Sequence, residues 1–151
     1  LDLYGIGYNP ILSQVELGGE ISPENKAIQE KISAAQGLIF IYPTWWQNMP
    51  AILKGFIDRV FSRGFAYKYV GGLPVGLLKG RRAAVFTSTG GPKLYSLIVK
   101  RSRSLKVLVS DTLRFCGIRA KGFSLGGALH LDDAGKSKLD AIAAKLLDYL
   151  K

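Results

Sequence analysis

Two adjacent tryptophans follow an unbroken apolar run, and they are the most distinctive chemical feature of the chain. The run Leu38–Tyr42 is bounded by Gly37 and Pro43, and Trp45 and Trp46 come directly after it. Because open α/β sheets bind ligands beyond the carboxyl ends of their strands, these indoles can present flat apolar faces to a planar aromatic ligand. The alternative is that they fill core or dimer contacts, and for one of the pair this is at least as strongly expected.

A second loop with binding chemistry follows the apolar run Ala83–Phe86. It reads Thr87-Ser88-Thr89-Gly90-Gly91. Since Gly90 and Gly91 carry no side chain, their backbone N–H groups can approach a ligand closely. The glycines are equally compatible with a simple turn between a strand and the next loop.

The single cysteine and the single histidine give weaker indications of function than these loops. Cys116 is the single cysteine, so it cannot form an internal disulfide, and its apolar surroundings favour a buried small side chain over a redox thiol. His130 is the single histidine and precedes the last predicted helix. We expect it to serve at the surface or as a cap, and we expect no metal site.

Four segments have the pattern of β-strands, and the two loops described above each follow one of them. Leu38–Tyr42 is continuously apolar, as expected for a central strand with both faces covered by helices. Ala83–Phe86 is expected to be its buried neighbour in a parallel sheet. Leu1–Tyr4 reads as the end of a strand running into a loop, and Ile118–Leu125 as the last strand.

Four amphipathic helices are predicted between and after these strands. The first begins at Ser22-Pro23-Glu24, where Ser22 can cap free N–H groups and Pro23 suits the first helical position. The second runs from Pro50 to about Arg63, with Lys54, Asp58 and Arg59 away from its apolar stripe. The third and fourth are predicted over 105–115, ended by Gly117, and over the C-terminal segment introduced by Asp132 and Asp133.

Strands that alternate with helices indicate an α/β fold, a doubly wound parallel sheet in a three-layer sandwich. We expect one domain over residues 1–151. Such a sheet normally has about five strands, with the first in its centre. We therefore expect the chain to be N-terminally incomplete, with a first strand and helix ahead of Leu1, because a gap within a parallel sheet leaves backbone groups unpaired.

Composition excludes several classes of protein. The chain has 151 residues, 48% of them hydrophobic and 11% aromatic, which suffices for a sizeable core. No run approaches the roughly 20 apolar residues of a membrane-spanning helix, and the first residues lack a signal-peptide pattern, so a cytoplasmic protein is expected.

The formal net charge of +10 favours anionic partners. The basic residues include Lys79, Arg81 and Arg82, which are expected to lie on the solvated surface with some attraction for cofactor phosphates. No base-reading motif accompanies them, so nucleic acid is not an expected partner.

The motifs together resemble the flavodoxin-like NAD(P)H quinone oxidoreductases, the family that includes mammalian DT-diaphorase and bacterial modulators of drug activity. The resemblance covers nearly the whole chain. The matching segments are Asp2–Tyr4 with Tyr8–Ser13, Tyr42–Phe61 with Ser62–Tyr69, and Thr87–Gly91 with Tyr95–Leu97.

The resemblance implies a set of site residues. In the family, the positions of Pro43, Thr44, Trp45, Trp46 and Gln47 wrap the flavin ring, and those of Ser88, Thr89, Gly90 and Gly91 close its other edge. N–H groups at the glycines can stabilise the N1/O2 side of the reduced flavin.

The family also implies a catalytic residue and a departure from its usual pattern. Tyr95 corresponds to a cofactor-binding and catalytic tyrosine near the flavin O2, whose hydroxyl can donate to developing negative charge. Arg101 stands where the mammalian enzyme has a histidine. Arginine stabilises charge but does not relay protons near neutral pH.

The implied function is two-electron hydride transfer from NADH or NADPH, through a flavin, to a quinone. FAD is the expected cofactor and FMN is possible. Tyr67 and Tyr69 match tyrosines that line the substrate pocket from a partner subunit, and their aromatic loop would be a poor solvent surface, so a homodimer is expected. The alternative function is a non-catalytic flavodoxin-like regulatory or binding subunit.

Overall fold

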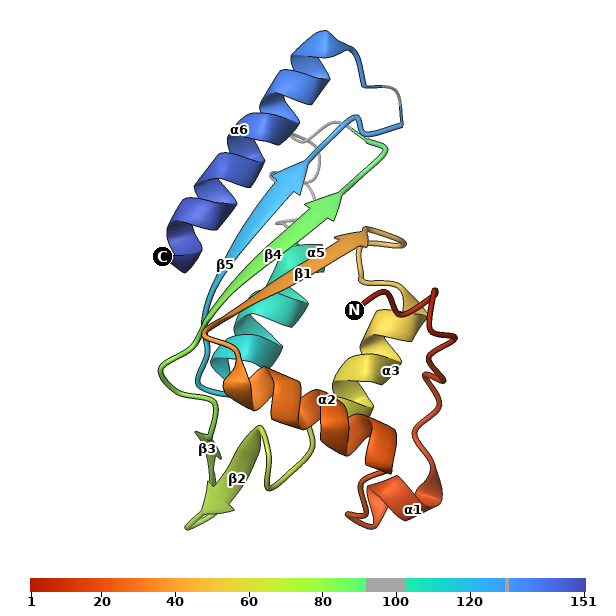
Figure 1. Cartoon of the computed structure of the whole chain (residues 1–151), viewed down its shortest axis with the longest axis vertical. Helices are drawn as coiled ribbons and strands as arrows, with labels where there is room; N and C mark the ends of the chain where they lie inside the picture. Colours follow the sequence, from red (N-terminus) through yellow and green to blue (C-terminus); the bar gives the residue numbers. More distant parts are fainter. Residues whose placement is uncertain (92–102, 130) are drawn as a thin grey trace.

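A computed structural model describes residues 1–91, 103–129 and 131–151, and Figure 1 shows their arrangement. In chain order the helices and strands are α1 (Gln14–Leu17), α2 (Pro23–Ala34), β1 (Gly37–Pro43), α3 (Ala51–Val60), β2 (Tyr67–Val70), β3 (Leu73–Gly76), β4 (Arg82–Ser88), α5 (Arg103–Leu108), the π-helical segment η1 (Val109–Arg114), β5 (Arg119–Leu125) and α6 (Asp133–Leu150).

A parallel sheet in the order β1-β4-β5 is the frame of the molecule. Phe40 of β1 lies opposite Val85 of β4, which in turn lies opposite Gly122 of β5. The predicted parallel pairing of the runs 38–42 and 83–86 is therefore confirmed. Helices pack on both faces of the sheet, as the predicted doubly wound fold requires (Figure 1).

The main core lies between the sheet and helices α2, α3 and α5. Alternating residues of the strands, among them Phe40, Val85 and Ala120, face this side. The helices contribute the apolar stripes that their sequence periodicity predicts, among them Ile28 and Ile32 of α2, Leu53, Phe56, Ile57 and Val60 of α3, and Leu108 of α5. The cap predicted at Ser22 is present, since its hydroxyl oxygen accepts the N–H of Asn25 at 3.3 Å.

The opposite face of the sheet carries α6 alone among the described residues. This helix packs on β4 and β5, and Asp132 caps its start by accepting the N–H of Gly135 at 2.7 Å. On β1 the face stays open, because Ile39 is 46% exposed and Ile41 is 72% exposed. The expectation of a central strand buried on both faces is wrong for the described residues, since β1 lies at the edge of the sheet.

The predicted strand end at Leu1–Tyr4 is also wrong. Residues 3–7 form turns, in which the Asp2 carboxylate accepts the N–H groups of Tyr4 and Gly5, both at 3.1 Å. A strand needs a neighbour for its backbone groups, and here local partners satisfy them instead. The apolar alternation of so short a run could not distinguish the two outcomes.

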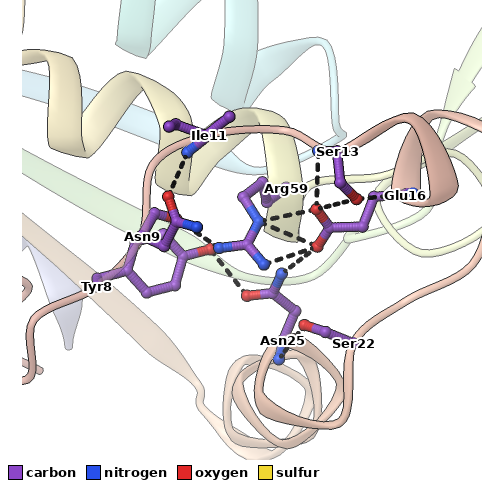
Figure 2. A network of polar contacts seen from close by, with 8 residues as sticks. All are labelled: Tyr8, Asn9, Ile11, Ser13, Glu16, Ser22, Asn25 and Arg59. Atoms are coloured by element: carbon purple, nitrogen blue, oxygen red, sulfur yellow. Dashed lines mark hydrogen bonds and ion pairs between the residues drawn. The ribbon is translucent and has the colours of Figure 1, made fainter.

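A buried ion pair fastens the segment after this turn to the helices, as Figure 2 shows. Arg59 of α3 donates to both carboxylate oxygens of Glu16 at 3.0 Å, and the Asn25 amide donates to the same carboxylate at 2.9 Å. The Tyr8 hydroxyl donates to Asn25 at 2.8 Å, and Arg59 also donates to the carbonyl of Asn9. Arg59 was expected on the polar side of its helix, but this long-range pair buries it.

Consecutive arginines at the start of β4 reach the C-terminal ends of helices in two different layers. Arg81 donates to the carbonyls of Ile32 and Ser33 in α2, at 3.2 and 2.6 Å. Arg82 donates to the carbonyl of Tyr149 in α6 at 3.0 Å. The expected role of these residues as solvated surface is wrong, since helix-end carbonyls lack partners of their own and attract positive charge.

The antiparallel hairpin of β2 and β3 was not predicted as a unit. Gly71 and Gly72 form its turn with φ of 57° and 80°, values that glycine adopts without strain. The hairpin packs against the end of η1, where the Leu78 N–H donates to the carbonyl of Cys116 at 2.9 Å. Cys116 is buried there as expected, and burial raises the pKa of its thiol to about 11.

Candidate functional site

The two loops selected from the sequence lie side by side beyond the carboxyl ends of β1 and β4. The Thr44 N–H donates to the carbonyl of Ser88 at 2.8 Å. The hydroxyl oxygens of Thr44 and Thr87 are 2.7 Å apart, within hydrogen-bond distance. The strand register therefore continues into the loops and fixes one against the other.

The tryptophan loop is a tight turn held by two backbone hydrogen bonds. Trp45 and Asn48 exchange N–H···O bonds, both of 2.9 Å. Trp46 and Gln47 stand between them with φ of 51° and 62°, the left-handed region that glycine and asparagine usually occupy. Such backbone conformations cost on the order of 1 kcal/mol or more each, and they gather at binding sites.

This strained turn holds its side chains in an unusual way. Trp46 is fully exposed, and Trp45 is 55% exposed. Neither indole is therefore buried in the core of the described residues, and the alternative of dimer contacts stays a prediction. Among the residues that the structure describes, the Gln47 side-chain oxygen Oε1 is buried and has no hydrogen-bond partner. A buried acceptor without a partner is costly, so it adds to the strain of this turn.

The glycine loop after β4 is supported by the loop after β5. The Thr89 N–H donates to the carbonyl of Leu125, the Ala128 N–H donates to the carbonyl of Thr89, and both distances are 2.9 Å. Neither Gly90 nor Gly91 has a positive φ, so neither is needed for a left-handed turn. A Cβ on Gly90 would lie 2.9 Å from the end of the exposed Leu129 side chain, which can shift, and no described residue lies within 4 Å of a Cβ on Gly91.

Sequence reasoning missed the contribution of the loop after β5. A cavity of about 630 Å³ opens between this loop, Gly90 and α6. Gly126 and Gly127 line it together with the lysines Lys138 and Lys145. The signal was present, because Gly126-Gly127 follows the last predicted strand in the same way that Gly90-Gly91 follows the one before it.

Tyr42 fixes the end of β1 directly before the tryptophan loop. Its hydroxyl donates to the carbonyl of Ser104 at 2.6 Å in the core, and burial raises the pKa of this phenol. It therefore stays protonated, and its role is to anchor the strand to the start of α5.

The structure does not bring Tyr67 and Tyr69 to these loops. Both lie on β2, at the opposite end of the molecule from the carboxyl ends of β1 and β4 (Figure 1). Tyr67 packs edge-on against Phe115, with ring centres 5.2 Å apart, and against Tyr69 at 5.9 Å. Tyr69 is 51% exposed beneath the guanidinium of Arg63. Tyr95, Arg101 and His130 lie outside the described residues.

A parallel sheet with helices on both faces, and with two loops meeting beyond its carboxyl edge, defines a doubly wound protein, a class that binds ligands at that edge. A family model, described as the flavodoxin-like fold, matches residues 1–150 of the chain. An uncharacterised NAD(P)H oxidoreductase of Haemophilus influenzae is 38% identical, over 95% of this chain and 74% of that protein. The chain therefore belongs to the flavodoxin-like family.

Further relatives agree with this placement. Rat NAD(P)H dehydrogenase (quinone) 1 is 32% identical, over 78% of this chain and 52% of that protein. The NAD(P)H:quinone oxidoreductase of Methanothermobacter marburgensis has a TM-score of 0.81 and 29% identity, over 95% of this chain and 76% of that one. The chain thus spans about half the length of the rat relative. Among the residues that the structure describes, no helix is long and apolar enough to span a membrane.

Proposed function

We propose that the protein is a flavin-dependent oxidoreductase that transfers two electrons from NADH or NADPH to a quinone, and that it works in the cytoplasm. The observation that carries the proposal is the strained turn at Trp46 and Gln47, which exposes an indole on a loop that is hydrogen-bonded to the glycine loop through Thr44 and Ser88. The names of the relatives from Haemophilus influenzae and rat support the same activity.

The residues at the carboxyl edge fit a flavin ring. A planar aromatic ring could stack on the exposed indoles of Trp45 and Trp46. Pro43 and Thr44 support the turn from the end of β1. Ser88, Thr89, Gly90 and Gly91 would line the other edge, where a glycine backbone can approach a ring closely.

When bound, the flavin supplies the hydride chemistry, accepting two electrons from the nicotinamide and passing them to the acceptor. The chain's own groups bind and orient it. Backbone N–H groups of the glycine loop would stabilise negative charge at the edge that they face. We propose that the Tyr95 hydroxyl donates to the same edge. We propose FAD as the cofactor, with FMN as the competing choice.

We further propose that the active protein is a homodimer. Tyr67 and Tyr69 lie far from the tryptophan loop of their own chain, so they can line the substrate pocket only if a second copy brings them there (Figure 1). Tyr69 is exposed on one face of the hairpin, and the paired residues Val70 and Leu73 are exposed on the other. Contact with a second copy would cover apolar side chains of this kind.

The deciding experiment uses the protein as its gene encodes it, mixed with FAD or FMN and then with NAD(P)H and menadione. We expect a yellow protein that oxidises NAD(P)H only when the quinone is present. Trp46→Ala is expected to lower kcat/KM about tenfold, which corresponds to roughly 1.4 kcal/mol, while the exposed-residue control Leu17→Ala leaves it unchanged. A protein that binds flavin weakly or not at all, and reduces no quinone, would instead support the non-catalytic binding subunit.

A further inference from the structure

A groove of about 740 Å³ lies beside the hairpin of β2 and β3. Tyr67 and Tyr69 of β2 line it together with Phe115, which follows η1. The ring centres of Tyr69 and Tyr67 are 5.9 Å apart, and those of Tyr67 and Phe115 are 5.2 Å apart. The three rings therefore form a continuous aromatic row, against which a flat ligand ring can pack.

The loop after α3 places Arg63 at one end of this row. Its backbone forms an isolated β-bridge with Tyr67, and the Gly64 N–H donates to the carbonyl of Tyr67 at 2.8 Å. The guanidinium of Arg63 lies over the ring of Tyr69, 5.9 Å from its centre. Because the loop and the strand are joined in this way, a ligand that contacts Tyr69 also meets the positive charge of Arg63.

Most of the charged side chains that line the groove are neutralised by ion pairs. These pairs are Lys54 with Asp58 and Glu16 with Arg59, with N···O distances of 2.5 and 2.9 Å. In the described part of the chain, neither Arg63 nor Asp111 has an ion-pair partner. Asp111 lies in η1, four residues before Phe115, the ring at the far end of the row from Arg63. The groove thus offers a guanidinium at one end of the aromatic row and a carboxylate near the other.

An aromatic compound that carries a negative charge matches this arrangement. Its ring can pack on the tyrosines, and its carboxylate or sulfonate can accept two parallel N–H groups from the guanidinium. The net charge of +10 draws such an anion to the protein. Asp111 repels the charged group, so it favours the single orientation in which that group points to Arg63.

We propose that Arg63 is a specificity-determining residue, which selects quinone acceptors that carry a carboxylate or sulfonate over uncharged ones. The inference rests on the proposed function, in which Tyr67 and Tyr69 of one copy line the substrate pocket of the other. Arg63 enters that pocket together with Tyr69. The reaction is unchanged, since a hydride from NAD(P)H and one proton convert the quinone to its hydroquinone and leave NAD(P)⁺.

The test uses the flavin-loaded protein as its gene encodes it and two acceptors that differ by one charge. These are a naphthoquinone with a propanoate side chain and the methyl ester of the same compound. Arg63→Gln is expected to lower kcat/KM for the acid about fivefold and to leave kcat/KM for the ester unchanged. Added salt is expected to reduce the difference between wild type and variant, because it screens the exposed charge.

The matched control is Lys68→Gln, which removes an exposed positive charge between the two tyrosines. Because side chains alternate along a strand, Lys68 lies on the other face of β2 from Tyr67 and Tyr69, and it does not line the groove. We therefore expect this variant to reduce the acid as wild type does. An equal loss in both variants, or an equal effect of Arg63→Gln on acid and ester, would overturn the proposal.

A calorimetric titration that needs no turnover separates this inference from the proposed function. The probes are naphthoate and its uncharged amide, and Arg63→Gln is expected to weaken binding of naphthoate about fivefold while binding of the amide stays the same. A protein that reduces no quinone but shows this difference would refute the proposed function and keep Arg63 as the residue that selects anions. A protein that reduces both quinones, with Arg63→Gln changing neither turnover nor naphthoate binding, would keep the function and refute the inference.

Discussion

Single residues decide how firmly the N-terminal segment is held, and Glu16 is the clearest case. The hydrogen bonds from Arg59 lower the pKa of this carboxyl to about 2, against an ordinary value of 4.5. A carboxyl whose pKa is lower in the folded state stabilises the fold above its unfolded pKa. That stabilisation is lost as the pH falls from 4.5 towards 2.

We therefore expect Glu16→Gln to lower the free energy of unfolding at pH 7 by about 2 kcal/mol, because it leaves the Arg59 guanidinium buried without its ion pair. The difference between variant and wild type should shrink as the pH falls below 4.5. Urea denaturation at several pH values measures both effects. A difference that stays constant down to acid pH would show that the ion pair contributes nothing through its charge.

A neutral hydrogen bond in the same network gives a smaller expected effect. Tyr8→Phe removes the hydroxyl that donates to the fully buried Asn25 and leaves that oxygen without a partner. We expect a loss of about 1 kcal/mol, almost independent of pH from 4 to 8. The matched control is Tyr4→Phe, an exposed residue, for which urea denaturation should detect no change.

The residue types in the tryptophan turn are expected to lower the free energy of unfolding of the protein. Trp46 and Gln47 have positive φ, whereas asparagine followed by glycine suits this turn. The double variant Trp46→Asn with Gln47→Gly is therefore expected to raise the free energy of unfolding by about 1 kcal/mol and to weaken flavin binding at least tenfold. Thermal unfolding and a flavin titration test the two halves separately. A less stable variant would mean that the wild-type turn carries no strain.

At the scale of elements, Gly55 shows packing and helix propensity acting in opposite directions. Helix propensity alone would favour alanine at this position, but the close packing of α3 against the N-terminal segment favours glycine. Alanine normally favours a helix over glycine by about 1 kcal/mol. A Cβ at Gly55, however, would lie 2.5 Å from the Cβ of Pro10. We expect Gly55→Ala to destabilise the protein by about 2 kcal/mol or more, as measured by urea denaturation. Stabilisation would show that the segment around Pro10 can move aside at little cost.

The elements differ in how far the sequence could predict them. The helix starts at Ser22 and Asp132 follow from local capping, and the parallel pair β1 and β4 follows from two apolar runs joined by a helix. The burial of Arg59 could not be predicted, because its partner Glu16 is 43 residues away in the chain. The turn over residues 3–7 was not predicted for a related reason. A short apolar run forms a strand only when a neighbouring strand pairs with its backbone groups.

At the scale of the whole molecule, the sheet explains which site residues sequence reasoning could bring together. Residues 43–47 and 88–91 meet because parallel strands end at one edge, a rule that needs no coordinates. The strained φ values of Trp46 and Gln47 and the support from the loop after β5 were not foreseeable. They depend on hydrogen bonds between segments whose sequences show no sign of each other.

Arg81 and Arg82 have a consequence for how this protein can change over evolutionary time. These neighbours bind helices on opposite faces of the sheet, and they do so at the amino end of β4. The two binding loops leave from the carboxyl ends of the strands. Mutations that change ligand binding can therefore accumulate at the carboxyl ends of the strands. The hydrogen bonds that hold the layers together at the amino end of β4 are not affected by them.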